Sequence, residues 1–205
     1  MDKKKTIAKK SEYEIEIKHS RFIGCAFPVK NTEQAEAIIS EIRNNHRKAK
    51  HNVYAYIIGS QTGYSDDGEP KKTAGLPIFD FLRKEELTDV LVVVTRYFGG
   101  ILLGTGGLVK AYTDAAKGAV LASGIVYKLI CQTYRFEVDY SDLAKLKAKI
   151  SELIVWDETE YGEKTFLTVA VKSENEEKLL KEASEILKGK APEVLGKREY
   201  SEKIN

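Results

Sequence analysis

The residues best suited to chemistry lie in one glycine-rich stretch, residues 89–110, with the sequence DVLVVVTRYFGGILLGTGGLVK. An apolar run, Val90–Val94, is typical of a strand buried on both faces, and Arg96 follows it closely. Arginine can bind phosphate or carboxylate in a bidentate manner, and a helix that starts after the glycines directs free N–H groups at the loop. The stretch therefore predicts an anion-binding site, although the glycines can equally serve tight packing alone. The residues of this predicted site are Arg96, Tyr97, Phe98, Gly99, Gly100, Gly104, Gly106 and Gly107.

A second concentration of positive charge lies in residues 43–51, which also hold two of the three histidines. These cations can contact a phosphate backbone, or they can form an ordinary solvated helix end. His46 and His51 are five positions apart, so they fall on different helix faces and do not predict a metal pair. The basic residues of the segment are Arg43, Arg47, Lys48 and Lys50.

An acidic turn, SDDGEP, lies between these two regions at residues 65–70. Asp66, Asp67 and Glu69 are weak candidates for binding Mg²⁺ through oxygen ligands, because acidic side chains in turns are commonly just solvated. Lys71 and Lys72 follow immediately and would partly neutralise the acids. We therefore predict no dedicated metal site and no cofactor, and we count the two lysines with the anion-binding residues.

Composition limits the class of protein. The 205 residues are 42% hydrophobic and 31% charged, which is typical of a globular chain, and no apolar run approaches the roughly 20 residues of a membrane helix. Cys25 and Cys131 lie far apart in apolar surroundings, which predicts buried free thiols and a reducing, cytoplasmic location. Residues 1–10 read as a mobile basic tail without a secretory signal. The first 125 residues have 19 basic and 15 acidic residues and the remainder 14 and 16, so the glycine-rich half is mildly basic.

The elements that must position these residues follow from periodicity. Asn31 or Thr32 can cap one helix and Thr73 another, and Gly124 ends the helix that follows the glycines. We predict strands at 12–18, 21–29, 52–58 and 90–94, a loop at 59–64, and a helix at 106–123. These elements make up a first domain, residues 1–126.

From residue 127 the pattern changes to strand, helix, two strands around Gly162, helix and strand. This βαββαβ order is the split βαβ arrangement of ferredoxin-like domains. We therefore predict an α+β protein of two domains, the second spanning residues 127–205. That domain contains neither a glycine loop nor a histidine, and its fold alone names no function.

Three segments together resemble the signature of the IMPACT family, in its bacterial YigZ/YvyE branch: SDDGEP at 65–70, TAGLPI at 73–78 and VVVTRYFGGILLGTGGLVKAY at 92–112. The resemblance extends over the whole chain, from residue 14 to the βαββαβ tail. One departure is visible, because Lys71 and Lys72 stand where the family usually has Ser-Gly. Besides the glycine-rich residues above, the positions that match the motif are Asp66, Asp67, Gly68, Glu69, Pro70, Thr73, Ala74 and Gly75.

The resemblance implies a fold for each domain. The N-terminal domain would be a ribosomal-protein-domain-2-like α/β sandwich, as in a ribosomal small-subunit protein, domain IV of elongation factor G, the ribonuclease P protein and the GHMP kinases. The C-terminal domain would resemble the ferredoxin-like domain V of elongation factor G. Eukaryotic members regulate translation by competing for an activator of an initiation-factor kinase. The bacterial branch has a different C-terminal domain, so that partner does not carry over, and the resemblance assigns no catalytic residue.

Three functional hypotheses follow. The first is a translation-associated regulatory protein that binds RNA, the ribosome or a translation factor, with no membrane or DNA partner; Tyr97 and Phe98 would stack on bases and the cations would contact the backbone. The second is an enzyme that binds phosphate or a nucleotide at the Gly99–Gly107 loop, with the acidic turn holding Mg²⁺. The third is a protein-interaction module anchored by the same two aromatic residues.

Overall fold

The computed structural model describes residues 3–203, which form two compact units. Residues 4–127 form one, here called the N-terminal unit, and residues 128–202 form the other, the C-terminal unit. The predicted α+β class is confirmed, because each unit combines helices with an antiparallel sheet.

The N-terminal unit is built on a five-stranded sheet in the order β2-β3-β6-β4-β5, whose neighbours are all antiparallel. The central strand is the Val-rich run of the sequence, and its residues from Val90 to Arg96 are buried, as predicted for a strand covered on both faces. The five strands are β2 (Ser11–Ile17), β3 (Ser20–Pro28), β6 (Val90–Tyr97), β4 (His51–Ile58) and β5 (Gln61–Ser65).

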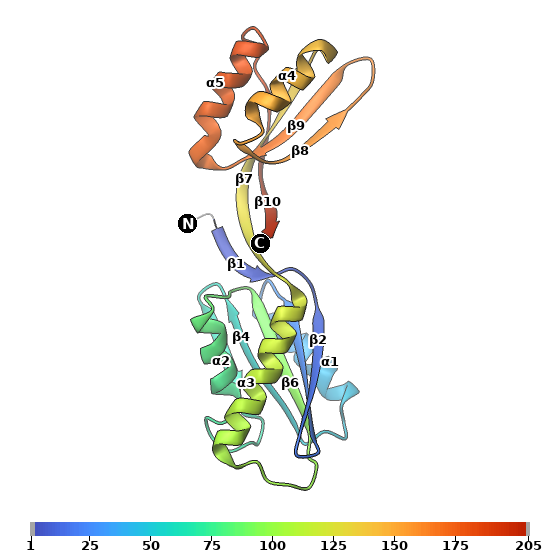
Figure 1. The fold of residues 1–205 in the computed structure, drawn as a ribbon, viewed down its shortest axis with the longest axis vertical. Helices are drawn as coiled ribbons and strands as arrows, with labels where there is room; N and C mark the ends of the chain where they lie inside the picture. Colours follow the sequence, from blue (N-terminus) through green and yellow to red (C-terminus); the bar gives the residue numbers. More distant parts are fainter. Residues whose placement is uncertain (1–2, 204–205) are drawn as a thin grey trace. The chain divides into compact units, whose positions relative to one another are not determined.

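Helices cover both faces of this sheet (Figure 1). α1 (Thr32–Asn45) packs on one face, where its isoleucines meet alternate residues of β3 and β6 such as Cys25 and Val93. α2 (Gly75–Lys84) and α3 (Gly104–Ser123) pack on the other face against the intervening residues, including Ala26 and Val92. The period-two alternation of each strand thus divides one sheet between two apolar cores, which is the predicted α/β sandwich.

Two segments of this unit that were predicted to lack regular structure are strands. Residues 3–7 are not a mobile tail but a strand, β1 (Lys3–Ile7), which pairs with β7 (Ile125–Val138); Ile7 is fully buried, and the Thr6 hydroxyl donates to the Asp89 carbonyl. Residues 61–65 are not a loop but the edge strand β5. Both segments are short and polar, and each is held extended by backbone pairing rather than by apolar periodicity: β1 pairs with the distant β7, and β5 forms a hairpin with the preceding β4.

The helix ends show how the unit is held locally. Asn31 caps α1 by accepting from the Gln34 amide, and Gly124 ends α3 with φ 72°, both as predicted. Thr73 does not cap α2, because its hydroxyl donates to the Pro70 carbonyl. The cap comes from Asp66, whose Oδ1 accepts from the amides of Ala74 and Gly75 at 3.2 and 2.8 Å.

The C-terminal unit has the order β7, α4, β8, β9, α5, β10, with a single 3₁₀ turn before α5. Its strands belong to a five-stranded sheet with the path β1-β7-β9-β8, in which β10 also pairs with β7, and the two helices pack around Leu146, Leu167 and Leu179. This order confirms the ferredoxin-like prediction. The elements not yet bounded are α4 (Tyr140–Ile150), β8 (Ile154–Glu160), β9 (Thr165–Val171), η1 (Ser173–Asn175), α5 (Glu176–Ile186) and β10 (Glu193–Lys203).

The two cysteines are buried and form no disulfide, as predicted. Burial, with the nearby Glu12 carboxylate, raises the pKa of the Cys25 thiol to about 11, so this thiol stays protonated at neutral pH. Among the described residues, no helix has the length and apolarity needed to cross a membrane.

Candidate functional site

Most of the residues singled out in the sequence meet at one end of the N-terminal sheet. The strand register pairs Arg96 with His51 and Tyr97 with Arg21, so the end of β6 lies beside the beginnings of β4 and β3. β5 also ends here, because Ser65 pairs with Tyr54. The segments 46–50, 66–74 and 98–103 therefore share this end of the sheet, where α3 begins (Figure 1).

Arg96 does not lie on an open surface, as the anion-binding prediction required. It is only 5% exposed, and its Nη1 donates to Glu69 Oε1 at 2.6 Å. The guanidinium also lies over the rings of Phe22 and Phe98, at 5.3 and 5.4 Å from the ring centroids. Its charge is therefore largely neutralised within the protein, while Nε is buried and has no hydrogen-bond partner among the described residues.

Glu69 is the centre of a buried polar cluster. The same Oε1 atom also accepts a hydrogen bond from the Tyr112 hydroxyl at 2.8 Å. Burial, together with the Glu69 carboxylate, raises the pKa of Tyr112, so the phenol remains a hydrogen-bond donor. Tyr112 belongs to an apolar row of α3 in the sequence; a tyrosine in that row was the one signal that a buried acceptor lay opposite.

His51 completes the cluster. Its Nδ1 lies 2.8 Å from the Asp67 carbonyl oxygen, and because a carbonyl can only accept, Nδ1 carries the hydrogen. Nε2 lies 3.8 Å from Glu69 Oε1, beyond hydrogen-bond distance. The backbone thus fixes the ring so that Nε2 accepts when neutral and donates when protonated.

The other acids of the turn hold the fold together. The Asp66 carboxylate accepts a hydrogen bond from the backbone amide of Lys72 at 2.8 Å, in addition to those from the amides at the start of α2. The Asp67 carboxylate accepts hydrogen bonds from the backbone amide of Asn52 and from the Arg43 guanidinium, both at 2.7 Å. A metal ion would have to displace these donors, and residues 3–203 contain no group of three or more His, Cys, Asp or Glu side chains placed to hold one.

A cavity of about 410 Å³ opens beside this cluster, at the beginning of α3. Its polar lining comes from Lys50, His51, Glu69 and Arg96, and its remaining walls are mainly apolar. The sequence analysis did not single out the leucines of this lining, because leucines near a helix start give no signal that distinguishes a ligand wall from a core. The other lining residues are Pro70, Phe98, Leu102, Leu103, Gly104, Thr105 and Leu108.

The glycines of the loop have different roles. A Cβ on Gly99 would lie 2.0 Å from the His19 carbonyl carbon, so this glycine permits a close backbone contact. Gly100 and Gly104 have φ of 88° and 74°, a region that glycine favours. A Cβ on Gly107 would lie 3.0 Å from Leu103 Cβ, whereas one on Gly106 would meet nothing within 4 Å. The fold therefore explains Gly99, Gly100 and Gly104, and it gives no reason for glycine at position 106.

The two aromatic residues after Arg96 are placed differently. Tyr97 is half-buried, and its hydroxyl lies 2.9 Å from Nδ1 of His46. Phe98 is 42% exposed, with the Lys50 ammonium 6.0 Å from its ring centroid. Phe98 is therefore the more accessible stacking surface.

The predicted cations gather at the same end of the sheet. Arg43 is paired with Asp67. The others are exposed, and none forms an ion pair with a residue of the described part of the chain; they are Arg47, Lys48, Lys50, Lys71 and Lys72. Two glycines of the family motif have structural roles: Gly68 has φ 86°, and a Cβ on Gly75 would lie 2.6 Å from the Ser65 carbonyl oxygen.

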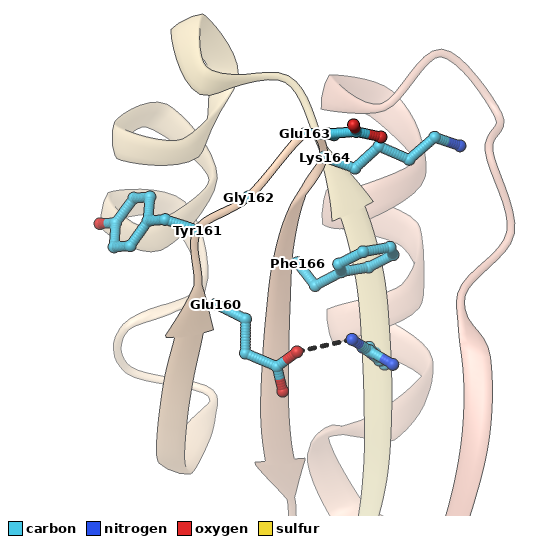
Figure 2. A pocket seen from close by; sticks show the side chains of 7 residues that line it. Glu160, Tyr161, Gly162, Glu163, Lys164 and Phe166 are labelled. Carbon is cyan, nitrogen blue, oxygen red and sulfur yellow. Dashed lines mark hydrogen bonds and ion pairs between the residues drawn. The ribbon is translucent and has the colours of Figure 1, made fainter.

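A cavity in the C-terminal unit, of about 430 Å³, lies on the β8–β9 hairpin. Figure 2 shows its lining, including Glu160 and Phe166, and Arg135 donates to Glu160 Oε2. The two side chains are 2.6 Å apart, and the guanidinium also lies 4.1 Å from the Phe166 ring centroid. Both cations of this lining, Arg135 and Lys164, are in ion pairs, whereas Lys50 in the cavity beside α3 forms none with the described residues, so this cavity is the weaker candidate.

Residues 18–120 match the family model of the Impact N-terminal domain. Over 202 residues the chain is 34% identical to the IMPACT family member YvyE of Bacillus subtilis, covering 97% of this chain and 93% of that protein. It is 37% identical to YigZ of Escherichia coli over 142 residues, or 67% of this chain and 70% of YigZ. A crystal structure of a hypothetical protein is similar with a TM-score of 0.62 and 30% identity, covering 96% of this chain and 98% of the other.

Proposed function

The chain belongs to the IMPACT family, in the branch that includes YvyE and YigZ, and we propose that it is a cytoplasmic, translation-associated protein that binds single-stranded RNA. The binding surface is the end of the N-terminal sheet where segments 46–50, 66–74 and 98–103 meet. We call this surface the basic end. A role in translation is what the family resemblance implies, and the RNA partner is the part argued from geometry.

The observation that carries the proposal is the imbalance of charge at the basic end. Its acids, Asp66, Asp67 and Glu69, are each occupied by internal donors, whereas five of its cations form no ion pair with described residues. An exposed phenylalanine, Phe98, lies among the cations. Proteins that bind single-stranded nucleic acid combine two features: cations that contact the phosphate backbone of the nucleic acid, and aromatic rings on which its bases stack.

The test is the salt dependence of RNA binding. We expect the full chain to bind a labelled single-stranded decanucleotide, with affinity falling steeply between 50 and 300 mM salt in a fluorescence anisotropy titration. Each phosphate contact contributes about 0.7 to the slope of log K against log salt, so removing two cations lowers the slope by about 1.4. Lys48→Ala/Lys50→Ala is the test variant and Lys84→Ala, at the far end of α2, is the control. A flat salt response, or equal loss in the control, would rule the proposal out.

The departure at Lys72 gives a sharper prediction. Lys72 has φ 65°, the region where glycine is favoured and where the family usually has glycine. Lys72→Gly relieves strain of about 1 kcal/mol, partly offset by about 0.5 kcal/mol of added freedom in the unfolded chain. We therefore expect this variant to be slightly more stable in urea unfolding, yet to bind RNA about five-fold more weakly at 0.1 M salt.

Lys71→Ser is the matched control for that prediction, because it removes the same charge at a residue whose φ is not positive. It should weaken RNA binding to a similar degree without the gain in stability. Should Lys72→Gly gain stability while RNA affinity stays unchanged, Lys72 is not part of the RNA-binding surface.

The enzyme alternative has partial support from the same geometry. The cavity beside α3 can accept a phosphate, but the acids that would hold Mg²⁺ are already engaged by Arg96, Arg43 and backbone amides. A Mg²⁺-dependent increase in melting temperature with ATP would favour the enzyme over the RNA-binding protein.

A further inference from the structure

The cavity beside α3 combines two kinds of lining in one small volume. Its apolar side includes Phe98, Leu102 and Leu108, and its polar side includes Lys50 and His51. Leu102 is 82% exposed and Phe98 42%, so two side chains of this lining present apolar surface to solvent. A volume of about 410 Å³ is at the lower end of the range for small-ligand sites, so it admits one small group and excludes a duplex.

The sign of the ligand's charge follows from the ion pairs. Arg96 and Glu69 balance each other inside the cluster. Lys50 is exposed, makes no ion pair with described residues, and lines the cavity. The cavity therefore has a net positive charge, contributed by Lys50, and it attracts an anion.

Hydrogen-bond donors lie close to this charge. Gly104 and Thr105 line the cavity as the first residues of α3, and no side chain caps that helix. The first amides of a helix have no partners within it, and they favour an anion. Independently of the helix, Arg96 lines the cavity, is only 5% exposed, and has a buried Nε with no hydrogen-bond partner among the described residues. A buried donor without a partner calls for an explanation, and an acceptor brought by a ligand is one.

We propose that this cavity binds a single nucleotide, with the phosphate at Lys50 and the start of α3 and the base against Phe98 and Leu102. The inference rests on the RNA-binding function proposed above and deepens it, because it assigns one unstacked nucleotide to a defined place. The same chemistry is offered by a terminal nucleotide of an RNA, by an internal nucleotide turned out of the strand, and by a free nucleoside monophosphate.

The experiment is calorimetry on the full chain with AMP and with adenosine, and anisotropy with decanucleotides that carry either a 5′-phosphate or a 5′-hydroxyl. We expect AMP to bind at least five-fold more tightly than adenosine at 0.1 M salt. Lys50→Ala should remove most of that preference. Leu102→Ala should weaken AMP and adenosine together, and because Leu102 is exposed this change leaves folding intact.

Two control variants match these changes away from the cavity. Lys84→Ala removes a cation at the far end of α2, and Leu121→Ala removes an exposed leucine near the C-terminal end of α3. Neither should alter AMP binding. A 5′-phosphate that strengthens RNA binding identifies a terminal nucleotide, and equal affinity for both decanucleotides together with loss on Leu102→Ala identifies an internal one.

The two proposals fail in different ways. RNA binding that depends on salt, with no AMP binding and no effect of Leu102→Ala, overturns the nucleotide site and leaves RNA binding standing. AMP binding with the expected variant pattern but no RNA binding supports the nucleotide site and overturns the RNA function. Absence of both overturns both.

Discussion

Replacing Glu69 with alanine is expected to lower the free energy of unfolding by about 3–5 kcal/mol, the largest effect we expect of any single substitution at the basic end. The change leaves the guanidinium of Arg96, only 5% exposed, without its counter-charge, and it leaves the Tyr112 hydroxyl without an acceptor. A buried charge that loses its partner costs more than the pair contributed, because its desolvation is no longer offset. Urea unfolding followed by far-UV circular dichroism measures the loss. Trp156, the only tryptophan, lies in the C-terminal unit and checks by fluorescence that this unit stays folded.

Two further variants separate charge from packing at Glu69. Glu69→Gln keeps an oxygen that can accept from Tyr112 but removes the negative charge, so its loss should be smaller than that of Glu69→Ala. Glu69→Met/Arg96→Met replaces the ion pair with apolar groups, so it should recover the part of the loss that comes from the unpaired charge, while the Tyr112 hydroxyl still lacks its acceptor. If Glu69→Ala cost less than about 1 kcal/mol, the Arg96–Glu69 pair would be a solvated contact rather than a buried one.

The framework of the N-terminal unit follows from local patterns. The apolar run Val90–Val94 identifies the strand at the centre of the sheet, and residues 21–29 supply its neighbour. The spacing of Ala35, Ile39 and Ile42 identifies the buried face of α1. These signals are local because each element buries its own regular face. β1 and β5 have no such face, and only pairing with other strands makes them extended.

The candidate site is harder to predict because its contacts are distant in sequence. Arg96 and Glu69 are both visible as charged residues, but they are 27 positions apart, and no periodicity indicates that they meet. From the sequence alone, an arginine at the end of a strand is expected to face solvent. Here the strand is central, so Phe22 on β3 and Phe98 beyond β6 cover the guanidinium. Because Arg96 is paired with Glu69, Lys50 is the cation of this cavity that is available to balance an anionic ligand. The sequence alone assigns Lys50 only to the basic segment 43–51.

The roles of the three acids in the acidic turn also depend on contacts that are distant in sequence. Its three carboxylates resemble a magnesium site when only their spacing is known. In the structure one caps α2, one holds the start of β4 and Arg43, and one neutralises Arg96. Because all three carboxylates are engaged by internal donors, the neighbouring Lys71 and Lys72 form no ion pair with them.

Gly99→Ala is the second substitution for which we expect a large effect. Its Cβ would lie 2.0 Å from the carbonyl carbon of His19, and backbone on both sides prevents an easy shift. The Gly99 amide also donates to the Ser20 hydroxyl at 3.1 Å, so the contact fastens the loop to the start of β3. Overpacking of this kind costs about 1–3 kcal/mol, and it should displace residues 100–103, including the cavity-lining Leu102. Both urea stability and AMP affinity are therefore expected to fall.

Gly106→Ala separates this steric effect from a general requirement for glycine in the loop. A Cβ on Gly106 meets nothing within 4 Å, and the residue lies in the first turn of α3 with φ outside the positive range. Alanine there should raise stability by about 0.5–1 kcal/mol through its greater helix propensity. Because the fold gives no reason for glycine at 106, any loss of RNA affinity in this stabilised variant measures how closely the RNA backbone approaches the start of α3. Equal destabilisation by Gly99→Ala and Gly106→Ala would contradict the distinction, and the loop would then be a uniform packing element with no surface left for a ligand.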